Sequence, residues 1–449
     1  MGLSGLEIYK LLPKTNCKEC GQPTCLAFAM KLAAKQAELS ACPYVSEESK
    51  AALAAASAPP IRLITLGSDN FKIEVGNETV MFRHEKTFYH EPALMVRLKD
   101  TLPLSEFEAH VKSIAGYQVE RVGIQLAVNG LAIENASGDA GVFGNYVAAA
   151  RAITPKPFVL IAKSKAAMEA GLKASGTGNS LLYAADESNW QDMAALAKQY
   201  SAPVAVRADK GDLAALANLA EQVKSAGVED IVLDPGARGL GDGLAALTHL
   251  RRLALKKNFR ALGYPIITFP GEGANSETEE AILAAEHIAK YAGFIVLDHF
   301  DPASIYPLLT LRQNIYTDPQ KPIQVSPGLY EIGEPKPESP LLVTTNFSLT
   351  YFTVSGEVEG SGVPSWLLVA DSEGMSVLTG WAAGKFDAEK IAKSVKQFGA
   401  DQKTKHKKIV IPGAVAAISG ELEEELPGWE VLVGPREAID IPAYLKNWN

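Results

Sequence analysis

Eight short, almost wholly apolar segments follow one another between residues 93 and 298, and each pair is separated by a stretch that is long enough for a helix or turn. Strands that are apolar on both faces are typical of parallel sheets covered by helices. Eight such units within about 220 residues predict a closed (β/α)8 TIM barrel, with a doubly wound open sheet as the alternative. The segments are ALMVRL (93–98), VGIQLAV (122–128), FVLIA (158–162), SLLYAA (180–185), PVAVRA (203–208), DIVLD (230–234), PIITF (265–269) and FIVLD (294–298).

Differences in composition along the chain indicate further domains on both sides of the predicted barrel. All four cysteines precede residue 58, and the alternating pattern of the next segment predicts a small antiparallel meander. Six prolines between Pro319 and Pro340 indicate an extended linker. The predicted domains are a cysteine-containing domain (1–58), a β-rich connector (59–92), the barrel (93–316), a Pro-rich linker (317–340) and a C-terminal unit (341–449).

The C-terminal unit has the pattern of a flavodoxin-like or Rossmann-like α/β fold. A helix is expected over about residues 387–398, and the predicted strands end in loops of small residues. In open α/β sheets, ligands bind beyond the carboxyl ends of the strands. The expected strands are LLVTT (341–345), SWLLVAD (365–371), SVLTGW (376–381), KKIVIPG (407–413) and EVLVGP (430–435).

The cysteines have the spacing C-x2-C-x4-C-x16-C, and Pro43 follows the last one. Disulfides would be reduced in a cytosolic protein, and zinc modules usually present two separated C-x-x-C pairs. Three close cysteines with a distant Cys-Pro favour a 4Fe-4S cluster, while zinc and unligated thiols stay open as alternatives. A helix is expected after Cys25, so the chain must double back for Cys42 to reach the same site.

Charge and hydropathy exclude several classes of partner. The net charge of −9 argues against nucleic acid, because affinity for phosphates comes from Lys and Arg. The N-terminus has neither the pattern of an export signal nor that of a myristoylation signal. No apolar run approaches the ~18 residues of a membrane span. We therefore expect a cytoplasmic protein without membrane partners.

Two stretches carry a family resemblance. The segment LLPKTNCKECGQPTCLAFAMKLAAKQAELSACPY resembles the short cluster domain of redox proteins from anaerobes. Together with EGMSVLTGWAAGKF and IPGAVAAISGELEEELPGWEVLVGP, and with the order of domains, it makes the whole chain similar to the large (gamma) subunit of the corrinoid iron-sulfur protein.

The resemblance implies two cofactors and several partners. It implies that Cys17, Cys20, Cys25 and Cys42 ligate a 4Fe-4S cluster, and that the C-terminal domain binds a cobamide, a cobalt-containing corrinoid. The implied function is methyl carriage in the reductive acetyl-CoA (Wood-Ljungdahl) pathway. The implied partners are a small corrinoid iron-sulfur subunit, a methyltetrahydrofolate:corrinoid methyltransferase, CO dehydrogenase/acetyl-CoA synthase and a reductive activator.

A histidine ligand for cobalt is missing from the sequence. Many corrinoid domains supply one from an Asp-x-His-x-x-Gly motif, which this chain lacks; the C-terminal unit contains only His406, before a strand. His299 ends a barrel strand, where a packing or supporting role is the better interpretation. We therefore predict a base-off cobamide with no protein histidine ligand, which would ease reduction of Co(II).

The candidate cobamide contacts lie in the strand-end loops of the C-terminal unit. Small residues there allow backbone N–H groups to approach a corrin, and Asn, Ser and Thr offer hydrogen bonds. The alternative is that these loops are only turns. The candidates are Thr345, Asn346, Thr350, Gly374, Met375, Ser376, Val377, Leu378, Thr379, Gly380, Gly413, Ala414, Val415, Gly434 and Pro435, with Trp381 nearby.

The barrel offers polar residues but no catalytic pattern. Six of them are expected at carboxyl ends of strands, where barrel enzymes hold their active sites: Asn129, Asp234, Arg238, Glu272, Asp298 and His299. They form no recognisable triad or metal set, so docking of partners is the favoured role. Two further functions stay open: an electron-transfer adaptor without corrinoid, and a barrel methyltransferase that binds a pterin.

Overall fold

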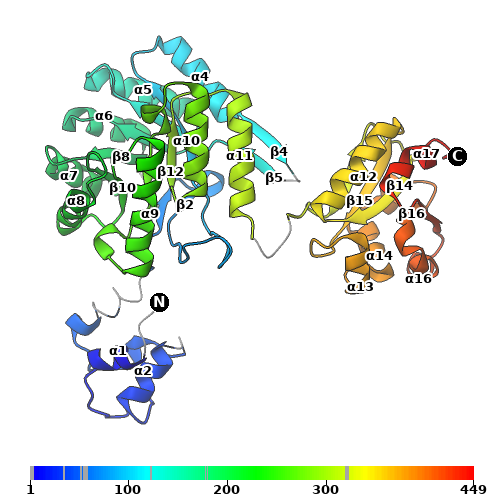
Figure 1. The fold of residues 1–449 in the computed structure, drawn as a ribbon, viewed down its shortest axis with the longest axis horizontal. Coiled ribbons are helices and arrows are strands. Elements are labelled where there is room, and N and C mark those ends of the chain that lie inside the picture. Colours follow the sequence, from blue (N-terminus) through cyan, green and yellow to red (C-terminus); the bar gives the residue numbers. More distant parts are fainter. Residues whose placement is uncertain are drawn as a thin grey trace.

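The computed structural model describes residues 5–33, 36–50, Leu53, 59–121, 124–176, Gly178, 180–318 and 323–448. Figure 1 shows them as three bodies in chain order: a small helical N-terminal body, a barrel and a C-terminal sheet with its helices. Within these ranges, every helix is too short or too polar to span a bilayer. The Ala-rich segment SKAALAAASAPP (49–60) predicts a helix that stops at the prolines, and most of that helix lies outside the described residues.

Eight parallel strands form one sheet in the order β10-β9-β8-β7-β6-β3-β12-β11. A parallel bridge between Leu233 and Ile266 joins the two ends of this sheet, so the barrel is nearly closed, as predicted. Its strands are β3 (Ala93–Lys99), β6 (Gly130–Glu134), β7 (Phe158–Ile161), β8 (Ser180–Ala185), β9 (Val204–Arg207), β10 (Ile231–Asp234), β11 (Ile267–Thr268) and β12 (Phe294–Leu297).

Helices cover the outside of the barrel and bury the outward side chains of its strands. Several begin at a side-chain cap: Asp139, Ser164 and Asp212 each accept a hydrogen bond from a backbone N–H of the first turn. The helices are α4 (Leu104–Gly116), α5 (Ala140–Ile153), α6 (Lys165–Ser175), α7 (Trp190–Tyr200), α8 (Leu213–Ser225), α9 (Leu240–Lys256), α10 (Glu277–Ala289) and α11 (Pro302–Tyr316).

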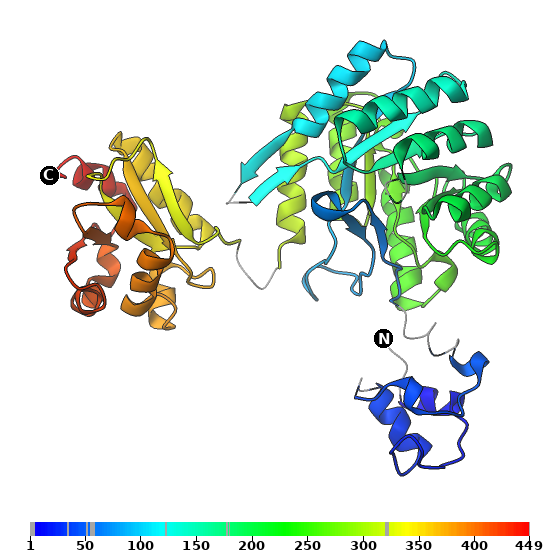
Figure 2. The same cartoon turned by 180° about the vertical axis from the view of Figure 1, so that it is seen from behind.

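The second barrel strand is not the one that we predicted. Residues 124–127 form β5 (Ile124–Ala127), which pairs antiparallel with β4 (Gln118–Arg121) in a hairpin outside the ring of strands (Figure 2). The barrel strand is β6, which begins eight residues after the start of the predicted segment and pairs with β3 and β7. Half of the β4–β5 side chains are exposed, whereas the first four residues of β6 are buried, so burial decides the assignment.

A two-stranded hairpin closes the amino-terminal end of the barrel. Strands β1 (Ile64–Leu66) and β2 (Ile73–Val75) pair antiparallel and are the only strands among the described residues of the connector. Their apolar side chains pack with inward-facing residues such as Met95 and Phe294. The barrel interior is therefore a packed core, capped from below.

The C-terminal sheet has the order β13-β15-β14-β16-β17, in which only the edge strand β13 is antiparallel. Part of the predicted linker belongs to this sheet, because β13 (Gly328–Ile332) pairs with β15 (Ser365–Ala370). The predicted strand at 376–381 is wrong: Val377–Ala382 is the helix α13, which leads from the loop after β15 to α14 (Ala388–Gln397). The remaining elements are β14 (Leu341–Thr345), α12 (Ser348–Ser361), α15 (Ala400–Lys403), β16 (Lys408–Ile411), η5 (Gly413–Ile418), α16 (Ser419–Glu425), β17 (Glu430–Val433) and α17 (Ile441–Leu445).

The position of β6 can be tested at Gly130. A Cβ at this residue would lie 2.2 Å from the Pro157 carbonyl oxygen and 2.7 Å from Met95 Cε. We expect Gly130→Ala to lower the free energy of unfolding by about 1–3 kcal/mol in a urea titration. Gly116→Ala is the matched control, because its Cβ would enter open space. Equal stability of both variants would contradict the placement of β6 in the barrel.

Candidate functional site

The three closely spaced cysteines lie on a tightly wound loop between α1 (Gly5–Leu11) and α2 (Cys25–Ala33). Asn16 fastens the end of this loop: its side-chain oxygen accepts a hydrogen bond from the Cys25 N–H at 2.8 Å, and its own N–H donates to Cys25 Sγ at 3.4 Å. A backbone donor therefore already faces one of the sulfurs. Positive φ angles occur at Lys14, Asn16, Lys18 and Gly21.

The fourth cysteine returns to the same small body. After α2, a short 3-10 helix (Leu39–Ala41) leads to Cys42, which packs in one apolar cluster with Cys25, Ile8 and Phe28. This fold supplies the reversal of the chain that the spacing required. Cys25 and Cys42 are buried, Cys20 is half-buried, Cys17 is exposed, and all four are free thiols. Four thiols in one small body fit the donor set of an iron-sulfur cluster. Within the described ranges, no three His, Cys, Asp or Glu side chains lie close enough together to hold one metal ion.

The order of strands in the C-terminal sheet reverses at β14, since the next two strands of the chain lie on opposite sides of it. The chain passes from β14 to β15 on one side and then crosses to β16 on the other. At such a switch point the loops at the carboxyl ends of the two central strands diverge and leave a crevice. The flavodoxin-like prediction therefore places a site beyond β14 and β16.

A cavity of about 300 Å³ lies at this place. Its walls come from the ends of β14, β16 and β17 and from α12 and the loops around them. Five predicted residues line it, namely Thr350, Val377, Ala414, Gly434 and Pro435. Sequence reasoning missed Thr344, Leu349, Thr353, Arg436 and Ala438, which line the same cavity.

Two threonine hydroxyls beside the crevice have no hydrogen-bond partner in the described structure. Thr344 and Thr345 are fully buried, and neither Oγ1 atom is hydrogen-bonded. A buried hydroxyl without a partner is costly. Thr344 also lines the cavity, which makes its unpaired hydroxyl a candidate partner for a polar group of a ligand.

Asn346 fastens the loops that form the crevice. Its buried side-chain oxygen accepts hydrogen bonds from Ser372 N, Ser372 Oγ and Gly374 N at 2.8–3.0 Å. Its amide nitrogen donates to Asp371 Oδ1 at 3.1 Å and to Gln324 Oε1 at 3.3 Å. Both polar atoms of this side chain are hydrogen-bonded within the protein, so Asn346 contributes by positioning the loops.

Two glycines allow the loops after β16 and β17 to touch. Gly413 N donates to Pro435 O, Gly434 N donates to Ile411 O, and a Cβ on Gly413 would lie 2.4 Å from Gly434 O. Val415 does not face the cavity, because it is buried in the core against α14 and α16.

The other predicted residues form the loop after β15 and the start of α13. Ser372 Oγ also lies 2.8 Å from Met375 O, so its single hydroxyl hydrogen is shared between this oxygen and Asn346 Oδ1. Ser376 Oγ donates to Thr379 Oγ1. Gly380 is buried against Phe386. Large apolar side chains are exposed near this end of the sheet: Leu349 (67%), Leu378 (53%), Trp381 (43%) and Ile439 (75%). We call these four residues the apolar rim.

The two histidines singled out in the sequence are engaged elsewhere. His406 precedes β16, so it lies at the amino edge of the sheet, opposite the cavity; Nε2 contacts Ser339 O and Nδ1 accepts from Lys408 N, each at 2.9 Å. In the barrel, His299 Nδ1 contacts Glu280 at 2.6 Å, and this hydrogen bond raises the pKa of His299. His299 is therefore engaged by a carboxylate of the barrel, and its supporting role stays a prediction.

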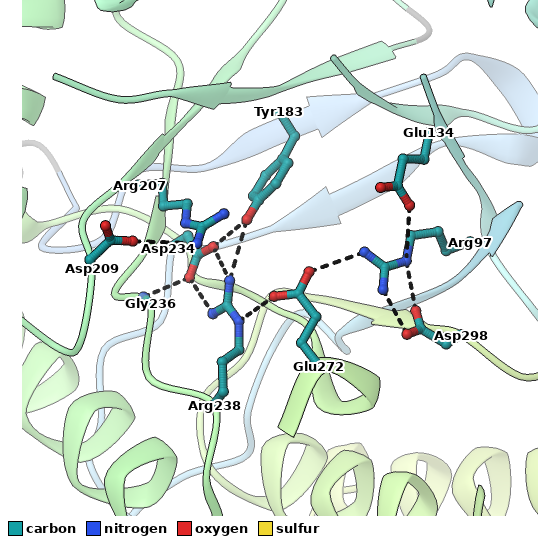
Figure 3. A network of polar contacts seen from close by, with 10 residues as sticks. All are labelled: Arg97, Glu134, Tyr183, Arg207, Asp209, Asp234, Gly236, Arg238, Glu272 and Asp298. Atoms are coloured by element: carbon teal, nitrogen blue, oxygen red, sulfur yellow. Dashed lines mark hydrogen bonds and ion pairs between the residues drawn. The ribbon is translucent and has the colours of Figure 1, made fainter. Parts of the chain in front are cut away.

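The carboxyl end of the barrel carries a network of alternating charges (Figure 3). Arg238 forms two bonds of 2.8 Å to Asp234 and one of 2.6 Å to Glu272. Arg97 contacts the other oxygen of Glu272 at 3.0 Å and both oxygens of Asp298. Sequence reasoning found Asp234, Arg238, Glu272 and Asp298 but missed Arg97, Glu134 and Tyr183, because strand interiors were treated as packing.

The side chains of this network form hydrogen bonds with one another. Tyr183 donates to Asp234 at 2.5 Å, and burial together with the Asp234 charge raises the pKa of its hydroxyl. Burial lowers the pKa of Arg238, but its bonds to Asp234 raise it more, so it stays charged. Asn129 does not lie at the carboxyl end of a strand, contrary to our prediction. It precedes β6 at the opposite end of the barrel, where its Oδ1 accepts a hydrogen bond from Leu94 N.

Comparison with known proteins gives full-length relatives. A family model described as CO dehydrogenase/acetyl-CoA synthase delta subunit matches residues 63–445, and a model for an Fe-S cluster matches residues 12–44. The corrinoid/iron-sulfur protein large subunit of Moorella thermoacetica is 46% identical over 446 residues, which is 99% of each chain. The acetyl-CoA decarbonylase/synthase complex subunit gamma of Methanothermobacter thermautotrophicus is 38% identical over 457 residues, again 99% of each.

Solved structures give only a remote likeness. Dihydropteroate synthase from Thermus thermophilus is 20% identical and covers 50% of this chain and 94% of its own, with a TM-score of 0.38. No statement about ligands follows from this likeness.

The role of Asn346 can be tested by its removal. Asn346→Ala would leave the buried N–H groups of Ser372 and Gly374 without acceptors, so we expect a loss of at least about 2 kcal/mol in the free energy of unfolding. Tryptophan fluorescence can follow unfolding of this unit, because four of the five tryptophans lie in it. Asn447→Ala is the control, since Asn447 is exposed and makes one hydrogen bond, to Ala443 O. A similar loss in both variants would refute the proposed anchoring role.

Proposed function

This chain belongs to the family of corrinoid/iron-sulfur protein large subunits and acetyl-CoA decarbonylase/synthase gamma subunits, and on that premise we propose that it carries methyl groups on a cobamide bound by its C-terminal unit. When bound, the cobamide would supply a Co(I) nucleophile that accepts methyl from methyltetrahydrofolate through a methyltransferase and delivers it to the nickel site of acetyl-CoA synthase. The observation that carries the proposal is the cavity at the β14/β16 switch point.

The residues around this cavity suit a corrin in three ways. The hydroxyl of Thr344 lacks a partner and is free to bind a polar substituent. The close contact of Gly413 with Gly434 brings backbone groups to the cavity wall. The apolar rim is suited to cover the faces of a large ring that the cavity itself cannot enclose. Asn346 and Gly374 then act by holding the loops in place.

The absence of a histidine at the cavity supports base-off binding. His406 is the only histidine of the C-terminal unit, and both of its ring nitrogens are engaged at the opposite edge of the sheet. A cobamide bound here would have no imidazole of this unit within reach.

Cys17, Cys20, Cys25 and Cys42 would hold a 4Fe-4S cluster, whose chemistry when bound is one-electron reduction of inactive Co(II). The Asn16 N–H that contacts Cys25 Sγ would stabilise the ligated thiolate.

We infer the partners of this chain from its relatives and from the exposed apolar rim. The relatives are subunits of larger assemblies, so we propose a small subunit and the CO dehydrogenase/acetyl-CoA synthase as partners. The apolar rim is an exposed surface that a subunit could cover. The methyltransferase and a reductive activator complete the proposal, as does a cytoplasmic location.

Anaerobic reconstitution with iron, sulfide and a cobamide tests this function. We expect about four irons and one cobalt per chain, and a Co(II) electron paramagnetic resonance signal without nitrogen splitting from histidine. Gly413→Ala should lower the cobalt content and leave the iron content unchanged, because its Cβ would push apart the loops at the cavity. Gly420→Ala is the matched control, with open space around its Cβ.

Three results would contradict the proposal in distinct ways. Iron without cobalt would favour the electron-transfer adaptor, and turnover of methyltetrahydrofolate by this chain alone would favour the pterin-binding methyltransferase. Nitrogen splitting in the Co(II) signal would refute base-off binding.

A further inference from the structure

A second recess lies near the amino-terminal end of the barrel, away from the ion network of Figure 3. It has a volume of about 450 Å³ and lies between the connector hairpin, the end of α4, the β4–β5 hairpin and α11. Its charged lining residues are Lys72, Glu91, Lys156 and Arg312. The proposed methyl-carrier function gives no role to this recess.

Arg312 is a buried cation on the wall of the recess. Its guanidinium donates to Pro92 O at 3.0 Å, to Ala127 O at 3.2 Å and to the Asn129 side chain. Its only carboxylate contact is Glu91 at 3.3 Å, and that side chain is 46% exposed. The Nε atom has no hydrogen-bond partner in the described structure.

Lys156 is a second buried cation on the same wall, only 7% exposed. Its ammonium donates to Val128 O at 2.7 Å, which is the single acceptor recorded for it among the described residues. An ammonium can donate three hydrogen bonds. Burial lowers the pKa of Lys156, as expected for a buried ammonium without a carboxylate partner among the described residues.

The two cations lie close together. Arg312 contacts the backbone oxygen of Ala127, and Lys156 contacts that of Val128. The two charged groups therefore bind adjacent peptide groups, and both residues line the same recess. Lys72, the third cation, is neutralised by Glu74 at 2.6 Å. Two buried positive charges therefore face one partly exposed carboxylate, and an uncompensated buried charge is unfavourable.

We propose that this recess binds the oxyanion group of a small molecule, a carboxylate or a phosphate, between Lys156 and Arg312. The free Nε of Arg312 and the unused donors of Lys156 are suited to an acceptor with several oxygens. The recess has room for a small metabolite around that group. Its occupation would compensate both buried cations.

Isothermal titration calorimetry on the full-length protein tests the site with two probes, inorganic phosphate and succinate. We expect saturable binding of at least one probe, and the preferred probe identifies the oxyanion. Lys156→Met should weaken that binding at least about tenfold, because a charge-assisted hydrogen bond is lost. Glu91→Gln should strengthen it, because the only competing carboxylate of Arg312 is removed.

Lys173→Met is the matched control. It also removes one lysine charge, but Lys173 is exposed, pairs with Glu169 and does not line the recess. The Lys173→Met variant should bind the preferred probe with the same affinity as the unmodified chain. The site is refuted if neither probe binds saturably, or if Lys156→Met binds as tightly as the Lys173→Met control. If Lys156→Met fails to fold, Glu91→Gln decides the question alone: unchanged or weaker binding overturns the proposal.

Discussion

The candidate cofactor site depends on the buried amide of Asn346. This side chain joins three separate segments: the residues before β13, the end of β14 and the loop after β15. Parallel strands hold their carboxyl ends at one edge, but the loops beyond them need a further tie to keep a crevice open. The hydrogen bonds of Asn346 provide this connection. The backbone hydrogen bonds of Gly413 and Gly434 connect the loops after β16 and β17 in the same way. Thr344, whose hydroxyl has no partner in the described structure, lines the cavity between these two connections.

The barrel is closed at both ends by its own residues. The β1–β2 hairpin packs into the amino-terminal end, and the arginine–carboxylate network of Figure 3 occupies the carboxyl end. Arg97 and Arg238 are each bonded to two carboxylates, so neither is available as a free cation for an anionic ligand. A barrel built in this way suits a scaffold that presents surfaces to partners. Lys156 and Arg312, two buried cations, instead line the recess near the amino-terminal end of the barrel.

The sequence was sufficient for the fold class because buried parallel strands leave a continuous apolar pattern. It failed at residues 122–128, since the outward hairpin is as apolar as β6, and only burial separates them. It also failed at 376–381, because a six-residue segment with β-branched residues is too short to show helical periodicity. Five predicted cavity residues were found from strand-end loops, whereas Thr344 and Arg436 depend on tertiary placement. Gln324 could not be linked to Asn346 from the sequence, because their contact joins distant segments.

The central claim is that one chain holds both the cluster and the cobamide, so that an electron passes between them within the molecule. Anaerobic stopped-flow spectroscopy on the reconstituted protein tests this directly, by following cluster oxidation and Co(I) formation after reduction of the cluster. The account predicts equal rates that do not change with protein concentration, and no Co(I) formation by this route in Cys20→Ala. A rate that rises in proportion to protein concentration, or one that is unchanged in Cys20→Ala, would contradict it.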